Sequence, residues 1–204
     1  MTRSPARTPI RSPMTDAGAA LERPVVLVGM MGAGKSTVGR RVAVKLGRPF
    51  ADTDALIEAR EGQSIAELFA TRGEPAFRDL EAAALRELVL GPELLVLATG
   101  GGAVVRPANR ALLREHATVV WLRASAGVLA HRVRQDGSRP LLADDPRAAI
   151  DRLLAEREPW YREVADHVVD VDHVDKRDVI AAVVAAATGN TVDPRTPTES
   201  GAPS

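Results

Sequence analysis

The sequence predicts an α/β protein with one parallel sheet that is covered by helices on both faces. Five short apolar runs alternate along the chain with segments of helical periodicity. This alternation is typical of parallel sheets, because the chain has to cross back over the sheet before each new strand. A glycine-rich loop also joins the first apolar run to the first helical segment. Folds of this class bind phosphate groups at such a loop.

The predicted strands are apolar runs bounded by turn-forming residues. Val38, Val42 and Leu46 recur at helical spacing behind the first of them, and a helix is expected after each of the others. The carboxyl ends of parallel strands share one rim of the sheet, and ligands of such folds bind there. The strands are predicted at residues 24–28, about 49–52, 94–98, 117–122 and 167–171.

Residues from about 55 to 90 hold more helices than one crossover requires, and we interpret this segment as a substrate-binding lobe. Ser64 and Glu67 match a capping box, which predicts that a short helix begins there. Gly73 suits the end of that helix, and Pro75 suits the first turn of a longer one. One apolar stripe is predicted on the longer helix, formed by Phe77, Leu80, Ala84 and Leu88.

The second half of the chain contains a polar, proline-containing segment between two predicted helices. Ser125 is expected to cap the first of these helices, which contains Arg132. We interpret the segment at about 134–146 as a lid. Pro146 can open the next helix, and Pro159 is predicted to end it.

Both ends of the chain are poor in residues that can form a core. Residues 1–22 are rich in Arg, Ser, Pro and Thr, and residues 189–204 are rich in Thr, Pro, Ser and Gly. We expect both stretches to be disordered tails. Residues 23–188 then form one domain, which is long enough to bury a sizeable core.

Composition narrows the class of protein. Lys+Arg and Asp+Glu both number 27, so there is no net basic charge of the kind that nucleic-acid-binding proteins usually carry. The absence of cysteine excludes disulfides and cysteine-based zinc sites. No apolar run approaches the length of a membrane span, and the N-terminus lacks the apolar region of a secretory signal. We expect a cytoplasmic, monomeric enzyme with small-molecule partners and neither nucleic-acid nor membrane partners.

The loop from Gly29 to Thr37 reads GMMGAGKST and fits the pattern G-x-x-x-x-G-K-[ST]. Its glycines let successive backbone N–H groups turn toward one anion, and the following helix adds its positive N-terminal end. Lys35 can reach the β- and γ-phosphates, and the Ser36 hydroxyl can ligate Mg²⁺. A glycine-rich turn without a ligand is the alternative, which the strand and helix around the loop disfavour. The predicted nucleotide contacts in the loop are Gly32, Ala33, Gly34, Lys35, Ser36 and Thr37.

Two aspartates follow the second predicted strand. Asp52 and Asp54 are two residues apart, and they are expected at the rim of the sheet near the glycine-rich loop. One carboxylate suits a Mg²⁺ site, and the other suits an acceptor hydroxyl. Alternatively, Asp54 only caps a helix that begins at Ala55.

A run of three glycines follows the third predicted strand. Gly100, Gly101 and Gly102 let the backbone approach a ligand closely and present N–H groups to it. The alternative is a tight turn between a strand and a helix. Their place at the carboxyl end of a strand favours ligand binding.

Four arginines are candidates for binding anions. Arg157 continues the apolar stripe of its helix, and a charge in such a position is rarely buried without a partner. A cation at a helix C-terminus is the alternative for it. Arg78 lies just off the stripe of its own helix, where a side chain usually faces solvent. Arg139 lies in the predicted lid, and Arg132 faces either a nucleotide or water.

Together these motifs resemble the shikimate kinase family over residues 23–187. A phosphate-binding loop alone is shared by many enzymes, but the loop combined with the other motifs is specific. The matching strings are GMMGAGKST at 29–37, DTD at 52–54, FR at 77–78, GGGA at 100–103, RPLL at 139–142 and R-x-P-x-Y at 157–161.

The resemblance implies a P-loop fold like that of the nucleoside monophosphate kinases, with three layers and a five-stranded parallel sheet. It implies ATP- and Mg²⁺-dependent phosphorylation of the 3-hydroxyl of shikimate, on the chorismate route to aromatic amino acids. Asp54 would hold substrate hydroxyls, and Arg78 and Arg157 would bind the substrate carboxylate. A backbone N–H within Gly100, Gly101 and Gly102 would also contact the substrate.

The resemblance also assigns the nucleotide side. Ser36 would ligate Mg²⁺, with Asp52 near the metal. Arg139 would reach the phosphates from the lid, and Arg132 would line the nucleotide site. Lys35, Asp54 and Arg139 are the expected catalytic residues, with Asp54 a candidate base. The family has one more basic nucleotide contact after its last strand, for which Arg177 is expected and Lys176 is the alternative.

Two rival functions are compatible with the phosphate-binding loop. One is another small-molecule P-loop kinase, such as a gluconate or nucleotide kinase. A nucleotide kinase needs a base-recognition pocket for its acceptor, and the sequence offers no clear one. The other rival is a module that binds nucleotide without catalysis, which has no need of carboxylate-binding arginines.

Overall fold

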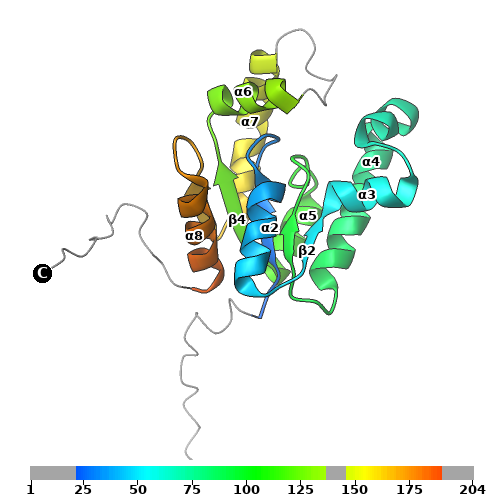
Figure 1. Ribbon diagram of the computed structural model, residues 1–204. Coiled ribbons are helices and arrows are strands. Elements are labelled where there is room, and N and C mark those ends of the chain that lie inside the picture. The colour runs from blue at the N-terminus through cyan, green and yellow to red at the C-terminus, as the bar shows by residue number, and fades with distance from the viewer. Residues whose placement is uncertain (1–21, 137–145, 190–204) are drawn as a thin grey trace, which may run out of the picture.

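The computed structural model describes residues 22–136 and 146–189 and contains a five-stranded parallel sheet (Figure 1). The strands stand in the order β2-β3-β1-β4-β5. All five predicted strands are confirmed, with ends that differ from the prediction by one or two residues. The strands are β1 Val25–Val28, β2 Phe50–Asp52, β3 Val96–Ala98, β4 Thr118–Arg123 and β5 His167–Asp170.

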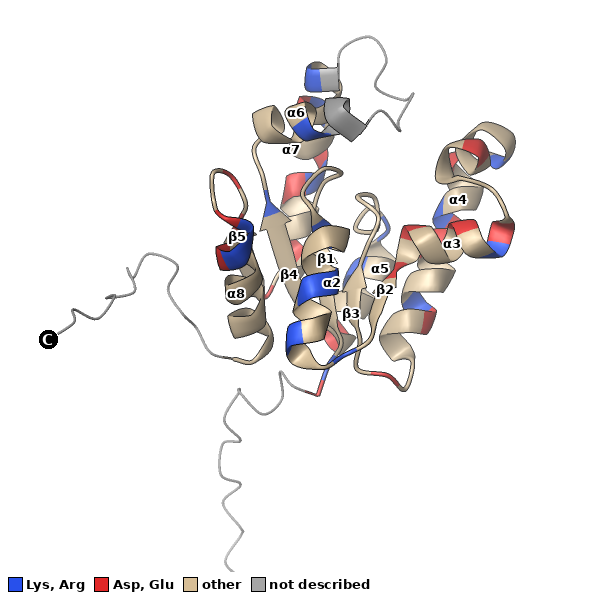
Figure 2. Cartoon of the chain, in the orientation of Figure 1, with Lys and Arg blue, Asp and Glu red and all other residues tan. Residues whose placement is uncertain are grey.

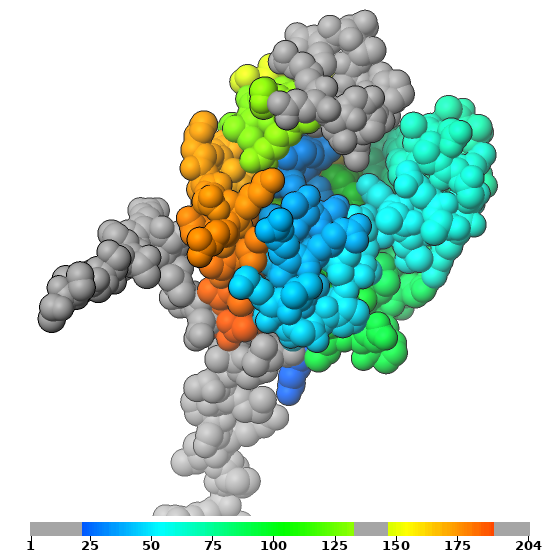
Figure 3. Space-filling view, viewed as in Figure 1, coloured from blue at the N-terminus to red at the C-terminus, as the bar shows by residue number. Residues whose placement is uncertain are grey.

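Helices cover both faces of the sheet, as the alternating pattern predicts. α2 and α8 lie in front of the sheet in Figure 1, and α5 and α7 lie behind it. α3 and α4 pack against each other and form a lobe to one side of the sheet, which Figure 3 shows in cyan. The helices are α2 Lys35–Leu46, α3 Thr53–Glu61, α4 Ile65–Leu90, α5 Pro107–His116, α6 Ala126–Asp136, α7 Pro146–Val164 and α8 Lys176–Ala187.

The centre of the sheet is β1, which pairs with β3 on one side and with β4 on the other. All four of its residues are fully buried, and each contributes roughly 2 kcal/mol by leaving water. Because the chain turns to opposite sides after β1 and β3, a crevice opens at the carboxyl ends of these strands. The loops that leave β1, β2 and β3 all meet at that crevice.

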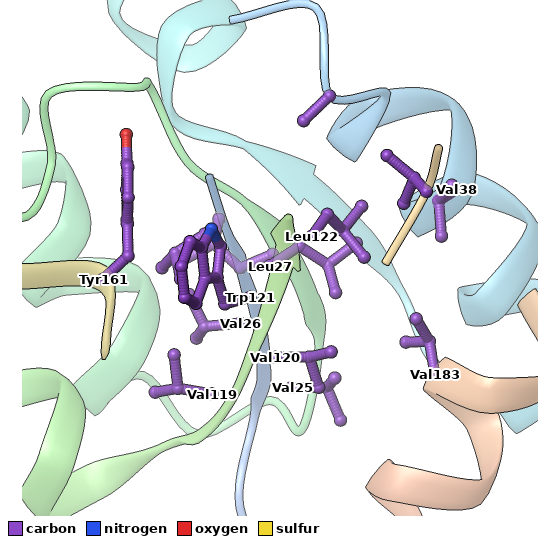
Figure 4. Packing of buried hydrophobic residues seen from close by; sticks show 14 of the residues in the cluster. Val25, Val26, Leu27, Val38, Val119, Val120, Trp121, Leu122, Tyr161 and Val183 are labelled. Carbon is purple, nitrogen blue, oxygen red and sulfur yellow. The ribbon is translucent and has the colours of Figure 1, made fainter. Parts of the chain in front are cut away.

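The apolar core continues behind the sheet toward α7. Trp121 of β4 and Tyr161 of α7 stack there, with ring centroids 5.8 Å apart (Figure 4). Both side chains are almost wholly buried. Trp121 is therefore a packing residue. The ring of Tyr161 lies in the core, and its hydroxyl lies near the carboxyl rim of the sheet.

The 55–90 lobe has the predicted helices, and the two that were expected on either side of Gly73 form one element, α4, with a break. Ser64 and Glu67 form both bonds of the capping box. α4 runs from Ile65 to Leu90 with a break at Gly73, whose φ of 78° is not helical. Gly73 thus ends one helical segment and Pro75 lies in the first turn of the next, as predicted.

The prediction that Pro159 ends a helix is wrong. α7 continues through Pro159 to Val164. Proline costs the helix one hydrogen bond, but Tyr161 and Val164 on the following turn are 1% and 2% exposed. Their burial offsets the lost bond, so tertiary packing overrides the local signal.

Some predictions fall on residues outside the described ranges. These are the two tails except residues 22 and 189, Arg139, and most of the expected lid. Within the described ranges, none of the helices combines the length and the apolar character that a membrane span requires.

Candidate functional site

The glycine-rich loop connects β1 to α2 and leaves the N-terminus of α2 open. Gly29 has a φ of 141°, and a Cβ there would lie 2.5 Å from the Leu122 carbonyl oxygen. Gly34 is left-handed at the N-cap of α2, where no side chain of the described residues provides a cap. The first N–H groups of α2 therefore face the loop without a capping side chain, as anion binding requires.

Lys35 is largely buried and lies back along this loop. Its ammonium donates to the carbonyl oxygens of Gly29 at 2.8 Å and Met30 at 2.9 Å. These bonds hold the ammonium group at the centre of the loop. From there a lysine side chain can reach a phosphate that the loop binds.

One cavity, the α2–α8 cavity, lies beside the loop and has a volume of about 320 Å³. Arg132 lines it and donates to the Gly32 carbonyl at 3.2 Å and to the Val171 carbonyl at 3.3 Å. Of the two basic residues at the start of α8, Lys176 lines the cavity and Arg177 is not among its lining residues. Both remain candidates for the basic nucleotide contact, and the cavity lining favours the alternative, Lys176. The other lining residues are Gly32, Ala33, Gly34, Thr37, Val38, Arg41, Val171, Val174, Val179 and Ile180.

Ser36 and Asp52 meet directly at the start of α2. The Ser36 hydroxyl donates to Asp52 at 2.6 Å. The other Asp52 oxygen accepts from the backbone N–H groups of Asp54 at 3.0 Å and Ala55 at 3.3 Å. Asp52 is therefore the N-cap of α3, and the alternative in which Asp54 caps this helix is wrong.

The Ser36–Asp52 pair has the chemistry of a magnesium site. Mg²⁺ prefers oxygen ligands and is usually held by one or two protein oxygens together with substrate phosphates and water. The described residues contain no cluster of three or more His, Cys, Asp or Glu that would bind a metal by themselves. The pair beside a phosphate-binding loop fits a metal that arrives with a nucleotide.

A second cavity, the α4–α7 cavity, opens on the other side of the loop with a volume of about 730 Å³. It brings together segments that are far apart in the sequence: the ends of β2 and β3, the lobe, and α7. Figure 2 shows that α3 and α4, which contribute to its lining, carry both acidic and basic residues. Its lining includes Met31, Ser36, Asp52, Asp54, Glu74, Arg78, Glu81, Gly100, Gly101, Gly102, Arg152 and Arg157.

Arg78 is buried in this cavity, so the solvent-facing alternative is wrong. It donates to Glu81 at 2.8 Å and to Glu74 at 2.8 and 3.1 Å. Glu81 is only 1% exposed. The two carboxylates hold the guanidinium at the cavity wall.

Burial affects the pKa values of Glu81 and Arg78 differently. Burial raises the pKa of Glu81, and the nearby Arg78 charge offsets only part of that rise. Burial lowers the pKa of Arg78, but Glu81 and Glu74 together outweigh that effect and raise it. The direction at Glu81 matters more, because a guanidinium keeps its proton in either case.

The three glycines pass directly beside these charges. A Cβ on Gly100 would lie 2.6 Å from an Asp54 carboxylate oxygen, and one on Gly102 would lie 2.1 Å from the Arg78 guanidinium. The Gly100 N–H is held by the Thr53 hydroxyl at 3.0 Å. Charged side chains occupy the space that another residue would fill, so a substitution at Gly100 or Gly102 would displace them.

Arg157 reaches the same glycine run from α7. It is 8% exposed, and its guanidinium donates to the Gly101 carbonyl at 3.3 Å. Its Nε is buried without a hydrogen-bond partner among the described residues. An anion that binds here would supply the missing acceptor. Arg157 is therefore a buried cation with an unused Nε donor, and the helix-terminus alternative does not describe it.

The two cavities meet at the phosphate-binding loop. Residues 32–34 and 37 line the α2–α8 cavity, whereas Met31 and Ser36 line the α4–α7 cavity. The structure thus brings all the described residues of the predicted acceptor side to one cavity: Asp54, Arg78, Gly100, Gly101, Gly102 and Arg157.

Sequence reasoning missed several residues of these cavities. Glu81 could have been identified from the sequence, because a glutamate three residues after Arg78 on the buried face of α4 is unusual. Tyr161 stands out in the sequence only as the last residue of the R-x-P-x-Y string. Nothing in the sequence indicated Arg152 of the α4–α7 cavity. The same holds for the apolar residues Val174, Val179 and Ile180 that line the α2–α8 cavity.

Known proteins resemble this chain over most of its length. The model of the family described as "Shikimate kinase" matches residues 31–188. A shikimate kinase of Nitrobacter winogradskyi is 54% identical over 154 residues, covering 74% of this chain and 72% of the relative. One of Halorhodospira halophila is 52% identical over 166 residues, covering 81% and 93%.

Solved structures give the same result. Shikimate kinase from Acinetobacter baumannii, in complex with shikimate, is 38% identical with a TM-score of 0.79, covering 87% of this chain and 99% of that one. Shikimate kinase from Aquifex aeolicus is 32% identical with a TM-score of 0.71, covering 82% and 97%.

Proposed function

The chain belongs to the shikimate kinase family, and on this premise we propose how its own residues carry out the reaction of that family. The protein is a kinase that transfers a phosphoryl group from ATP to a hydroxyl of shikimate. We place the transfer at the 3-hydroxyl, on the route to chorismate and the aromatic amino acids. The observation that carries the proposal is that two cavities, one beside an anion-binding helix N-terminus and one lined by buried arginines, meet at a single loop.

ATP occupies the α2–α8 cavity in this proposal. The backbone N–H groups from Gly32 to Thr37 hold its phosphates, and Lys35 leaves the loop carbonyls to contact the transferring group. Arg132 and Lys176 line the nucleotide site. Arg139, which lies outside the described residues, adds positive charge from the predicted lid.

Ser36 and Asp52 hold Mg²⁺, whose role is to neutralise charge on the phosphates. The 2.6 Å hydrogen bond between the two side chains supports this assignment, because it brings a hydroxyl and a carboxylate oxygen together beside the phosphate-binding loop. Asp52 also caps α3, so metal binding and the start of the lobe share one residue.

Shikimate occupies the α4–α7 cavity. Its carboxylate is bound by Arg78 and Arg157 and by N–H groups of the glycine run, which gives strong and directional charge-assisted bonds. Asp54 faces this cavity and binds the hydroxyls, and we assign to it the proton of the attacking 3-hydroxyl. Phosphoryl transfer depends chiefly on positioning and charge neutralisation, and these residues supply both.

A coupled assay of ADP release tests this function. The purified chain is mixed with ATP and with shikimate, gluconate or a nucleoside monophosphate, each with and without Mg²⁺. We expect turnover with shikimate and Mg²⁺ only. Turnover with another acceptor would reject the assigned substrate, and shikimate binding without ADP release would support a non-catalytic module. Because the reaction consumes ATP, we also propose that the enzyme works in the cytoplasm.

A further inference from the structure

We propose that Tyr161 is a positioning residue of the acceptor site, whose hydroxyl holds the Gly101 carbonyl and thereby sets the glycine run against Arg157 for the substrate carboxylate. This inference rests on the proposed function and adds a residue to it. The Tyr161 hydroxyl donates to the Gly101 carbonyl at 2.5 Å. That bond links α7 to the loop after β3.

The Gly101 carbonyl receives two donors from neighbouring turns of α7. Tyr161 is four residues after Arg157, so both side chains lie on one face of the helix. Arg157 donates to the same oxygen at 3.3 Å, which is a longer and weaker contact. When Arg157 turns its donors to a substrate carboxylate, the tyrosine bond remains to hold the carbonyl.

The glycine run needs such a hold because it has little conformational preference of its own. Glycine populates more backbone conformations than any other residue, and Gly100, Gly101 and Gly102 follow one another. A peptide unit is planar and trans, so a fixed Gly101 carbonyl also fixes the opposite direction of the Gly102 N–H. The tyrosine hydroxyl therefore orients a backbone donor that the substrate site uses.

Gly101 also lies against the phosphate-binding loop. A Cβ on it would lie 3.3 Å from the backbone nitrogen of Met31, and Met31 lines the α4–α7 cavity. The carbonyl that Tyr161 holds thus belongs to the segment between the two substrates. A displacement of that segment would change the approach of shikimate to the phosphates.

A neutral hydroxyl suits this position better than a charged donor. Burial raises the pKa of Tyr161, which opposes the lowering by Arg157, so the side chain remains a neutral donor. The cavity already holds Arg78 and Arg157 against Glu81 and Asp54. Another cation would compete with the arginines for these carboxylates, whereas a hydroxyl adds a hydrogen bond without adding charge.

The ring of Tyr161 is secured independently of its hydroxyl, which makes a clean test possible. It is 1% exposed and stacks on Trp121 at an interplanar angle of 23° (Figure 4). The substitution Tyr161→Phe keeps the ring and its stacking and removes the hydroxyl, and with it the bond to Gly101 and the contact of the hydroxyl with Arg157. A purely structural role predicts lower stability with unchanged substrate constants.

Steady-state kinetics of Tyr161→Phe test the proposal. We expect the KM for shikimate to rise about fivefold, the effect of one hydrogen bond, with the KM for ATP unchanged. Trp121→Phe is the matched control, because it reduces the stacking area and leaves the hydroxyl in place; its melting temperature should fall and its KM values should stay. An unchanged KM for shikimate in Tyr161→Phe, or equal changes for both substrates, would overturn the proposal. If the parent enzyme itself shows no turnover with shikimate, the proposed function fails instead.

A second measurement uses the parent sequence and so avoids any failure of the variant to fold. Tyr161 is the single tyrosine of the chain, so growth with 3-fluorotyrosine labels this ring alone. We expect its ¹⁹F resonance to shift when shikimate saturates the enzyme, because the substrate takes donors of Arg157 from the shared carbonyl. A resonance that does not respond to saturating shikimate would contradict a link between Tyr161 and the acceptor site.

Discussion

The two cavities that meet at the phosphate-binding loop are built in different ways. The α2–α8 cavity is formed largely by a glycine-rich backbone, a helix N-terminus and apolar side chains. The α4–α7 cavity is formed by buried charges that come from α3, α4, the glycine run and α7. Backbone N–H groups bind any phosphate of the right shape, whereas paired charges select a particular anion. The comparison indicates that nucleotide binding is a local property and that acceptor selection is a tertiary one.

The largest effect is expected from a substitution at the junction of the two cavities, which should impair catalysis but not acceptor binding. Lys35→Ala should reduce kcat about a thousandfold, because a preorganised cation at the transferring group is lost. Shikimate binding, measured by calorimetry, should survive because Lys35 is not among the residues that line the α4–α7 cavity. Lys45→Ala, an exposed lysine at the other end of α2, is the control and should be neutral. Retained turnover in Lys35→Ala would undo the assignment of the phosphate-binding loop.

The next effect belongs to the acceptor side alone. Arg157→Ala should weaken shikimate binding about a hundredfold, since charge-assisted hydrogen bonds to a buried carboxylate are lost. The affinity for ATP should change little. Arg162→Ala on the same helix removes an exposed pair with Glu158 and should have no effect on either ligand. Equal losses for both ligands would mean that the two cavities are not separate in function.

A backbone substitution sharpens the same contrast. Gly102→Ala places a methyl group where the Arg78 guanidinium lies, at 2.1 Å, and so displaces the arginine from Glu81. We expect the KM for shikimate to rise about tenfold, equivalent to the loss of one good interaction, with the KM for ATP unchanged. Gly127→Ala in α6 serves as the control, because a Cβ there would lie 3.3 Å from the exposed Arg147 guanidinium and 4.0 Å from the Ser125 hydroxyl. Normal kinetics in Gly102→Ala would show that the position of Arg78 is not critical.

A smaller effect is expected at the rim of the α2–α8 cavity. Lys176→Ala should raise the KM for ATP about threefold, because an exposed cation contributes little to binding in water. The KM for shikimate should not change. Arg177→Ala is the neighbouring control, since Arg177 does not line the cavity. A larger effect in Arg177→Ala than in Lys176→Ala would restore the original expectation from the sequence.

The last effect concerns stability rather than binding. The native state holds the Glu81 proton to a higher pH than the unfolded chain does, because burial raises this pKa above its ordinary value of 4.5. The contribution of Glu81 to the free energy of unfolding is therefore lost as the pH rises from its ordinary pKa through its raised pKa in the native state. Urea unfolding across that range should show the parent losing stability relative to Glu81→Gln as pH increases. The opposite slope would mean that Arg78 outweighs burial and keeps Glu81 ionised.

Residues that act through local geometry were predictable. The strand, the glycines and the helix around Gly29–Thr37 are contiguous, so their conformations follow from short-range preferences. The capping box at Ser64 and the break at Gly73 were predicted for the same reason and are confirmed. The five strands were predicted because fully buried parallel strands appear as continuous apolar runs.

The burial of charges was less predictable. Arg78 follows Phe77 on α4 and lies just off the apolar stripe of the helix, the position of an ordinary surface arginine. Only the packing of α4 beside the glycine run buries it against Glu81. The continuation of α7 past Pro159 was mispredicted because Tyr161 and Val164 are held by the distant strand β4 and its neighbours, not by their own helix.

The amino-acid sequence by itself determined the parallel α/β architecture, the phosphate-binding loop and the resemblance to the family. Only the tertiary structure decided which charges share one cavity, that Asp52 rather than Asp54 caps α3, and that Tyr161 meets Arg157 at the Gly101 carbonyl. The reason is physical: backbone conformation depends on residues a few positions apart, whereas burial and charge pairing depend on chain segments that meet only when the sheet and its helices have packed.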